Sequence, residues 1–312
     1  MASVERVSWR GLGSIFLLSF LLAGETSAVE LATEPTNQLA GPEEIFSDDF
    51  ESAGLFEWTD WTAGSATPFR FSDLDLRDPH LFIDLPVFGC FDFTDTALPL
   101  DFGPSFNQAL SDAVTSDGDM DNLLDLSLLL LFRPLTPMAF RERVDSVRGL
   151  CSAPIGSTSC DRDPASPREI LPYSGQTAGI CLEPVAGTTG GYTPTVAEPG
   201  APCFVTEAEE FSIDLNGLTI PLLAAQTAGT LSGSPVDQLT PGLLLGFLRE
   251  ADADALLLPA DLPIVGGQPL SILLRGGTGN CSSGDDRDTF MDESGWWFYF
   301  NFTADLVPYT GP

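Results

Sequence analysis

The sequence predicts a mainly β protein, an antiparallel β-sandwich of jelly-roll type with one short helix and long loops tied by disulfides. Short apolar runs alternate with polar residues at the two-residue period of a strand, and Gly, Pro, Asn and Asp separate these runs. Helical spacing occurs in one stretch only. Many short strands divided by turn signals are typical of two packed sheets.

The N-terminus has the order of residues found in a secretory signal. Arg6 and Arg10 precede an uncharged run at residues 11–22, and the small residues Thr26 and Ala28 stand before a cleavage point at Val29. A membrane anchor is the alternative, but this run is shorter than the roughly 20 apolar residues that a bilayer requires. We therefore expect residues 1–28 to be a signal peptide. The mature chain would be extracellular, periplasmic or attached to the cell surface, with no membrane span.

The mature chain divides into four parts by composition. Residues 29–44 lack apolar periodicity and are expected to form a flexible spacer. Residues 45–150 are predicted to form a β domain. Residues 151–205 are rich in Gly, Pro, Ser and Thr and hold four of the six cysteines, which indicates a disulfide-tied excursion or a boundary between two β units. Residues 206–312 are expected to form a β-rich region that packs on residues 45–150.

Strands are expected at several places along the chain. Residues 68–77 alternate with one register break, and residues 80–91 and 123–132 have the composition of more deeply buried strands. Residues 296–303 are aromatic on both faces, as in a central strand that is covered on both sides.

A hairpin is expected at residues 211–222, because Asn216-Gly217 lies between two alternating runs. A type I′ turn needs two residues at positive φ, which Asn and Gly tolerate. The one expected helix begins with Thr240 as N-cap and Pro241 in its first turn, and it continues to about Ala251.

The cysteines are expected to form disulfides rather than a metal site. All six follow the predicted cleavage point, and an even number in an exported chain favours disulfides. A zinc site is disfavoured, because there is no C-x-x-C motif and only one histidine. Spacing alone does not determine the pairing. The pairing we expect is Cys151 with Cys160, Cys181 with Cys203 and Cys90 with Cys281.

The net charge of −32 arises from 45 acidic and 13 basic residues, and every basic residue is arginine. Nucleic acids and anionic membranes are held mainly by contacts of Lys and Arg with phosphate, so neither is an expected partner. The main effect of this charge is solubility, and cation binding is the more specific alternative.

The best candidate site is an acidic run at residues 117–125. Calcium requires six to eight oxygen ligands, and acids at alternate positions can wrap a short loop around one ion. Asn122 occupies the place of the sharp turn, where glycine is usual and asparagine is the next best choice. The alternative is a solvated acidic turn. The predicted ligands are the carboxylates of Asp117, Asp119, Asp121 and Asp125 and the carbonyl of Leu123.

Two local resemblances accompany these observations. Residues 117–125 resemble the aspartate loops of dockerins, thrombospondin type 3 repeats and EF-hands, which implies calcium binding. The pattern departs from those families at its twelfth position, where Leu128 replaces an acid. Residues 45–61 resemble a short sequence motif found near the start of many secreted bacterial proteins. In some of those proteins the motif begins a lectin-like jelly-roll domain.

No catalytic constellation stands out. His80 is the sole histidine, no Gly-x-Ser-x-Gly motif precedes a helix, and the phosphate-loop pattern is missing. We therefore expect a secreted, calcium-stabilised protein that binds a carbohydrate or a surface or matrix component without catalysis. A glycan hydrolase with paired carboxylates and a purely structural envelope component are the alternatives.

Overall fold

The computed structural model describes residues 66–311, except positions 102, 157, 216–217, 261, 263, 280 and 282–283. The predicted signal peptide, the spacer and the 45–61 segment lie outside the described residues. None of the helices in the described part has the length and hydropathy of a membrane span.

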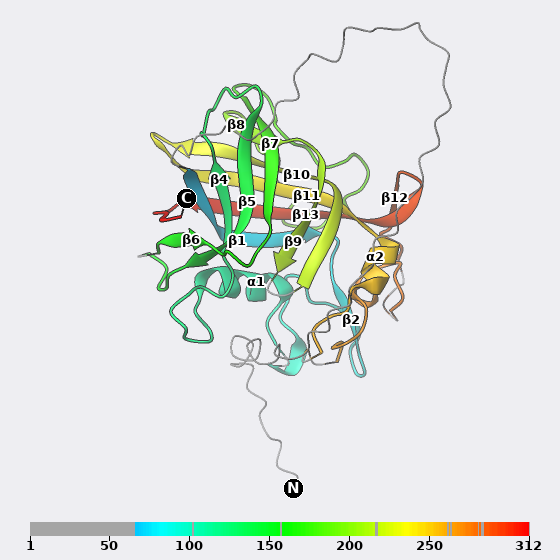
Figure 1. Ribbon diagram of the computed structural model, residues 1–312. Coiled ribbons are helices and arrows are strands. Elements are labelled where there is room, and N and C mark those ends of the chain that lie inside the picture. The colour runs from blue at the N-terminus through cyan, green and yellow to red at the C-terminus, as the bar shows by residue number, and fades with distance from the viewer. Residues whose placement is uncertain are drawn as a thin grey trace, which may run out of the picture.

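Eight antiparallel strands form a closed barrel (Figure 1). Each strand pairs with its neighbour around the barrel, and the last pairs with the first. In order around the barrel, the strands are β1 (Thr67–Asp78), β4 (Leu128–Phe132), β5 (Glu142–Cys151), β7 (Arg168–Gln176), β8 (Cys203–Thr206), β10 (Leu218–Gly233), β11 (Val236–Arg249) and β13 (Glu293–Leu306). Strands β7 and β8 bring a minor part of the Gly- and Pro-rich 151–205 segment into the barrel wall.

The predicted β-sandwich is wrong, because the two ends of the main sheet pair with each other. β13 lies between β11 and β1, with registers that run from Phe69 opposite Leu306 to Asp78 opposite Tyr299. Closure removes the open sheet edges that a sandwich would leave. Apolar and polar residues alternate along each strand in the same way in a sandwich and in a barrel. The sequence pattern therefore could not distinguish the two folds.

The predicted strands at 68–77 and 296–303 are confirmed within β1 and β13. The 123–132 segment forms a strand only from Leu128 onward, in β4. Residues 80–91 do not form one strand. They form most of a separate hairpin of β2 (Phe82–Leu85) and β3 (Gly89–Asp92), because the chain turns at Gly89, which has φ +67°.

The predicted hairpin at 211–222 is confirmed in its pairing. β9 (Glu209–Leu215) pairs with the first part of β10, from Leu215 opposite Leu218 to Phe211 opposite Leu222. The two turn residues lie outside the described positions. Ala224 has φ +46° where the register shifts, so β10 bends there and directs the β9–β10 arm to one end of the barrel. Two three-residue strands, β6 (Cys160–Arg162) and β12 (Asp288–Phe290), pair with β5 and β13.

The predicted helix at 240–251 is wrong, because these residues lie mostly in β11. Leu243, Leu245 and Phe247 are buried on one face of β11, and Leu244 and Leu248 are buried on the other. A strand that is apolar on both faces also places apolar residues at helical spacings, so periodicity alone misleads. The described helices are α1 (Phe106–Thr115) and α2 (Glu250–Ala255), with short 3-10 turns η2 (Pro99–Asp101) and η3 (Leu270–Leu273).

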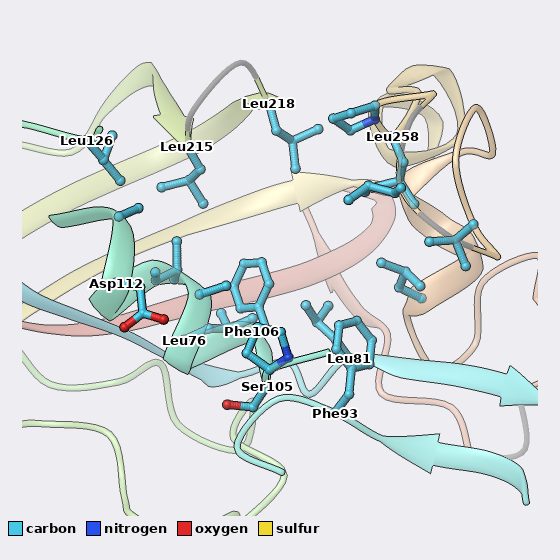
Figure 2. Close-up of a pocket in the computed structure, with 18 of the residues that line it drawn as sticks. Leu76, Leu81, Phe93, Ser105, Phe106, Asp112, Leu126, Leu215, Leu218 and Leu258 are labelled. Carbon is cyan, nitrogen blue, oxygen red and sulfur yellow. The ribbon is translucent and has the colours of Figure 1, made fainter. Parts of the chain in front are cut away.

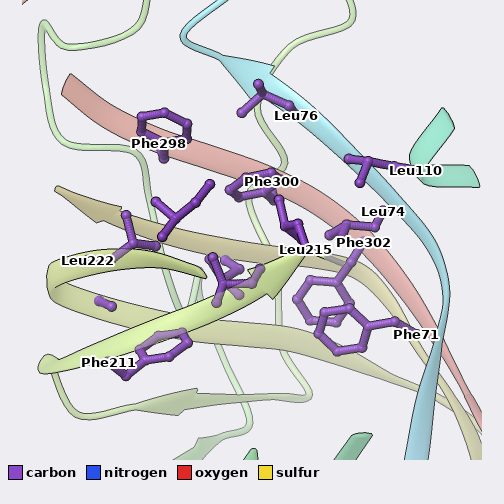
Figure 3. Close-up of a cluster of buried hydrophobic side chains, with 14 of the residues drawn as sticks. Phe71, Leu74, Leu76, Leu110, Phe211, Leu215, Leu222, Phe298, Phe300 and Phe302 are labelled. Carbon is purple, nitrogen blue, oxygen red and sulfur yellow. The ribbon is translucent and has the colours of Figure 1, made fainter. Parts of the chain in front are cut away.

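The core is the interior of the barrel, together with the arm and loops at one of its ends. Figure 3 shows Phe71 and Phe302 face to face, with ring centroids 4.4 Å apart. Phe211, Leu215 and Leu222 of the β9–β10 arm point into the same cluster. A smaller cluster on the outer face, around Phe247 and Tyr299, is covered by the 182–196 loop.

Three disulfides tie the loops to this frame, and they are the three pairs expected from the sequence. Two are local, since the Cys151–Cys160 pair joins β5 to β6 and the Cys181–Cys203 pair joins a loop to the start of β8. The third, Cys90–Cys281, spans 191 positions and joins β3 to the segment that follows η3. Disulfides are compatible with an oxidising compartment.

Candidate functional site

A cavity of about 770 Å³ lies at one end of the barrel (Figure 2). The barrel wall supplies Leu76 of β1 and Phe300 of β13, and the β9–β10 arm supplies Leu215, Leu218 and Ile220. These residues belong to the alternating positions of their strands that face inward. The cavity is therefore the part of the barrel interior that side chains do not fill.

The rest of the wall comes from segments that cross the barrel end. Helix α1 contributes Leu110, the segment between β1 and α1 contributes Leu81 and Phe93, and the 256–274 segment contributes Leu258 and Leu270. α1 begins at an N-cap, where the Ser105 hydroxyl accepts the Gln108 N–H at 3.1 Å.

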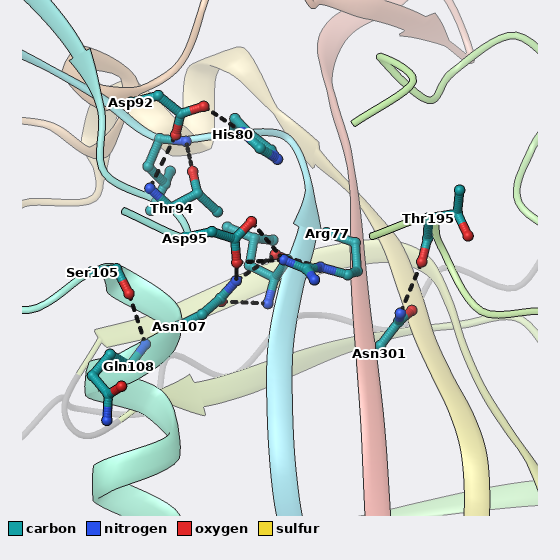
Figure 4. A network of polar contacts seen from close by, with 12 residues as sticks. Arg77, His80, Asp92, Thr94, Asp95, Ser105, Asn107, Gln108, Thr195 and Asn301 are labelled. Atoms are coloured by element: carbon teal, nitrogen blue, oxygen red, sulfur yellow. Dashed lines mark hydrogen bonds and ion pairs between the residues drawn. The ribbon is translucent and has the colours of Figure 1, made fainter. Parts of the chain in front are cut away.

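A network of polar contacts holds α1 and the segment before it against the barrel (Figure 4). Asn107 of α1 accepts the Leu76 N–H at 2.8 Å and donates to the Leu76 carbonyl at 2.9 Å, so it acts as a strand partner at the edge of β1. Its amide also donates to Asp95, which pairs with Arg77 through two hydrogen bonds. Because Asn107 is buried, loss of these bonds would leave unsatisfied backbone groups, so the network fixes α1 over the cavity.

The lining is almost wholly apolar. Its ionisable groups in the described residues are Asp112 and Asp125, and its hydroxyls are Ser105 and Ser116. Burial raises the pKa of Asp125, whose carboxylate accepts the Gly118 N–H. Histidine, cysteine, lysine and arginine do not occur among the described lining residues. The wall can exclude water from an apolar molecule, with a polar edge on one side.

The predicted calcium loop lies beside that polar edge. Carboxylate oxygens of Asp117, Asp119 and Asp125 lie within 4.8 Å of one another, while Asp121 does not belong to this group. Asn122 has φ +70°, the left-handed turn expected at this position. Leu123, the predicted carbonyl ligand, forms a β-bridge with Ser152.

Several carboxylates of the loop also accept backbone N–H groups of the loop itself. Asp117 accepts from Asp121 and Asn122 at 3.0 Å each, and Asp121 accepts from Leu123 at 2.7 Å. These bonds hold the chain in a tight turn. Among the described residues of the loop, Asp117, Asp119 and Asp125 are the carboxylates close enough together to hold one cation.

The sole histidine is buried beneath a loop and is not among the cavity-lining residues. Nδ1 of His80 lies 2.6 Å from the Asp92 carboxylate, and its ring stacks on Tyr192 with centroids 3.4 Å apart. The Tyr192 hydroxyl donates to Asp286 at 3.0 Å. These contacts hold the 183–200 loop against the end of β1, which is a structural role.

Asp78, at the end of β1, is a buried carboxyl whose pKa is raised. It is 4 % exposed and accepts the Gly190 N–H at 2.6 Å. Burial, reinforced by Asp286, raises its pKa from 3.8 to about 6. Between these values the folded protein holds a proton that the unfolded chain releases, so this contribution to stability increases as the pH falls from about 7 to about 4.

We expect Asp78→Asn to raise the free energy of unfolding at pH 7.5 by about 1–3 kcal/mol, because the amide avoids the cost of burying a charge. Its oxygen can still accept the Gly190 N–H. Urea unfolding at pH 4.5 and pH 7.5 measures the effect, and the gain should shrink at the lower pH. Asp73→Asn, at an exposed position of the same strand, is the control. An equal gain at both pH values would contradict the assignment.

A second buried carboxylate organises the outer face of β4, β5 and β7. Asp145 is fully buried and accepts from Arg133 at 2.9 Å, from Arg143 at 2.6 Å and from Arg168. Three cations thus surround one anion in a strongly acidic chain. The arrangement ties together three neighbouring strands of the barrel.

Sequence reasoning located the acidic loop but missed the cavity, α1 and the Asp145 cluster. A signal for α1 was present, since Ser105 precedes Leu110 and Val114, which lie four positions apart and are buried. The lining residues carry no comparable signal, because a leucine that faces a cavity and a leucine in a filled core have the same local pattern. No protein-family model matches the chain, and no curated protein or solved structure resembles it significantly.

Proposed function

We propose that the protein binds one small apolar molecule, such as a long-chain fatty acid or a terpenoid, in the cavity at the barrel end. The observation that carries this proposal is the lining, which is apolar on nearly all sides and polar at one edge. Removing apolar surface from water contributes roughly 25 cal/mol per Å². The cavity volume lies in the usual range for small-molecule sites.

The same lining is less suited to a carbohydrate, the ligand class expected from the sequence. A sugar presents hydroxyl groups in all directions, and each buried hydroxyl requires a hydrogen-bond partner. The wall supplies only two carboxylates and two hydroxyls, next to more than a dozen apolar side chains. The three disulfides support a site of action outside the cytoplasm.

Titration with cis-parinaric acid, a fluorescent polyene fatty acid, tests the proposal. We expect saturable binding with Kd on the order of 50 μM or tighter, because drug-sized ligands gain about 0.3 kcal/mol per non-hydrogen atom and this probe has about 20 such atoms. Palmitic acid or retinol should displace the probe, and maltose and galactose should not. A fluorescence signal that does not saturate, or one that only the sugars reduce, would contradict the proposal.

A second candidate function is calcium binding by the 117–125 loop, favoured by the close approach of three carboxylates. We expect calorimetry to give Kd of about 10⁻⁴–10⁻³ M, as in other extracellular modules with few ligands. Asp119→Ala should lose the heat of binding, because two carboxylates hold the ion poorly. Asp163→Ala, in a turn elsewhere, should bind as the wild type does. Equal heats for wild type and Asp119→Ala would exclude the loop.

A further inference from the structure

Five large apolar side chains are exposed on three segments that border the cavity: the β2–β3 hairpin, residues 96–100 and residues 256–270. They range from 48 % exposed for Phe88 to 85 % exposed for Val87. We call them the apolar rim, and its members are Val87, Phe88, Leu100, Leu257 and Ile264. Side chains of this kind usually lie inside a protein, and a group of them around one opening indicates a contact surface.

The rim belongs to segments that also build the cavity. Ile83 and Leu85, on the strand that leads to Val87, form a buried cluster with Leu98, and Val265 packs against it. Ile83, Leu98, Leu258 and Val265 all line the cavity. Figure 1 shows the β2–β3 hairpin and the orange 256–274 segment side by side at the same end of the barrel. The cavity wall therefore continues directly into the rim.

The tips of the rim loops carry no charge, although Asp84, Asp101 and Asp261 lie beside them in the same loops. Residues 85–91, 96–100, 256–260 and 264–270 contain no acidic or basic side chain, in a chain whose net charge is −32. The acidic surface elsewhere would oppose approach to an anionic membrane. It would also oppose association of two copies of the chain through these loops. The rim thus presents uncharged apolar tips flanked by acids, and residues 81–104 and 256–274 contain no Lys or Arg that would attract an anionic surface.

The types of residue in the rim loops also indicate which kind of partner they contact. Energetic centres of protein–protein interfaces are enriched in Trp, Tyr and Arg, and the four rim loops contain none of these. Their exposed side chains are aliphatic or phenyl groups on separate loop tips. Such tips can enter a lipid interface independently, whereas a protein partner needs a fitted surface.

We infer that the apolar rim docks the protein on zwitterionic lipid surfaces. The ligand would then pass between lipid and cavity without crossing water, a consequence that rests on the proposed function. Docking on lipid does not require a ligand in the cavity. The docking inference and the proposed ligand binding can therefore be contradicted separately.

Flotation with phosphatidylcholine vesicles tests the docking, using the full mature chain without added ligand. The wild type should float with the vesicles, and the double variant Val87→Asp/Phe88→Asp should show at least a tenfold lower bound-to-free ratio. Phe140→Asp is the matched control, because Phe140 is 96 % exposed on the β4–β5 loop, at the other end of β4 from the cavity. It should float like the wild type. Adding phosphatidylserine should weaken flotation of all three proteins.

Three results would overturn the inference. The wild type could stay unbound, as it would if a second copy or the segment before residue 66 occupied the rim. The double variant could float as well as the wild type, or Phe140→Asp could lose flotation equally. Titration of the double variant with cis-parinaric acid in solution separates the proposals, since unchanged affinity shows that the cavity is intact. Circular dichroism of each variant confirms that the barrel is folded.

Discussion

Replacing Asp145 with alanine is expected to lower the free energy of unfolding by about 3–5 kcal/mol, the usual cost of breaking a buried ion pair by removing one partner. Asp145 is the common acceptor for Arg133, which directly follows β4, Arg143 of β5 and Arg168 of β7. Without it, three guanidinium groups would face one another, and two of them are nearly buried. Both desolvation and mutual repulsion would then act against the folded barrel.

Chemical denaturation at pH 7 measures this loss. Asp237→Ala, at an exposed position near the start of β11, should change stability by less than about 0.5 kcal/mol. The triple variant Arg133→Met/Arg143→Met/Asp145→Leu should recover much of the loss, because it removes charges of both signs. A loss for Asp145→Ala no larger than that of the control would show that the cluster is dispensable.

Filling the cavity is expected to weaken probe binding by at least tenfold. Ala109 lines the cavity from α1, and a tryptophan there would occupy space that the ligand needs. The substitution adds apolar volume to a void, so the fold should be retained. Titration of Ala109→Trp with cis-parinaric acid measures the loss.

The matched control is Gln108→Trp. Gln108 is the preceding residue of α1, is exposed and does not line the cavity. It should bind the probe as the wild type does. If Ala109→Trp kept full affinity, the probe would be bound elsewhere.

Local properties of this molecule could be predicted from its sequence. The alternation in residues 68–77 and the Asn-Gly pair both describe neighbours along the chain, and both predictions are confirmed in their pairing. The even cysteine count predicts disulfides, and the three pairs that form are the ones expected, although the sequence alone does not determine the pairing. The turn at Asn122 follows from the tolerance of asparagine for positive φ.

Non-local properties could not be predicted in this way. Barrel closure depends on the pairing of β1 with β13, which are more than 200 positions apart. The buried state of Asp145 depends on Arg133, just after β4, and on Arg168 of β7, and in the sequence Asp145 is one acid among 45. The cavity depends on how α1 and the 256–274 segment cross the barrel end. The sequence around Leu110 and Leu258 has no local pattern that indicates a cavity.

The most direct test of the proposed binding site is to observe which methyl groups touch a bound ligand. Isotope-filtered NMR with ¹³C-methyl-labelled protein and unlabelled palmitic acid would detect them. We predict nuclear Overhauser contacts from the ligand to Leu110, Leu218 and Leu258, which line the cavity. Leu129 and Leu131, buried in a separate cluster, should show none. Contacts confined to other residues, or no contacts at saturating ligand, would contradict the claim that this cavity is the binding site.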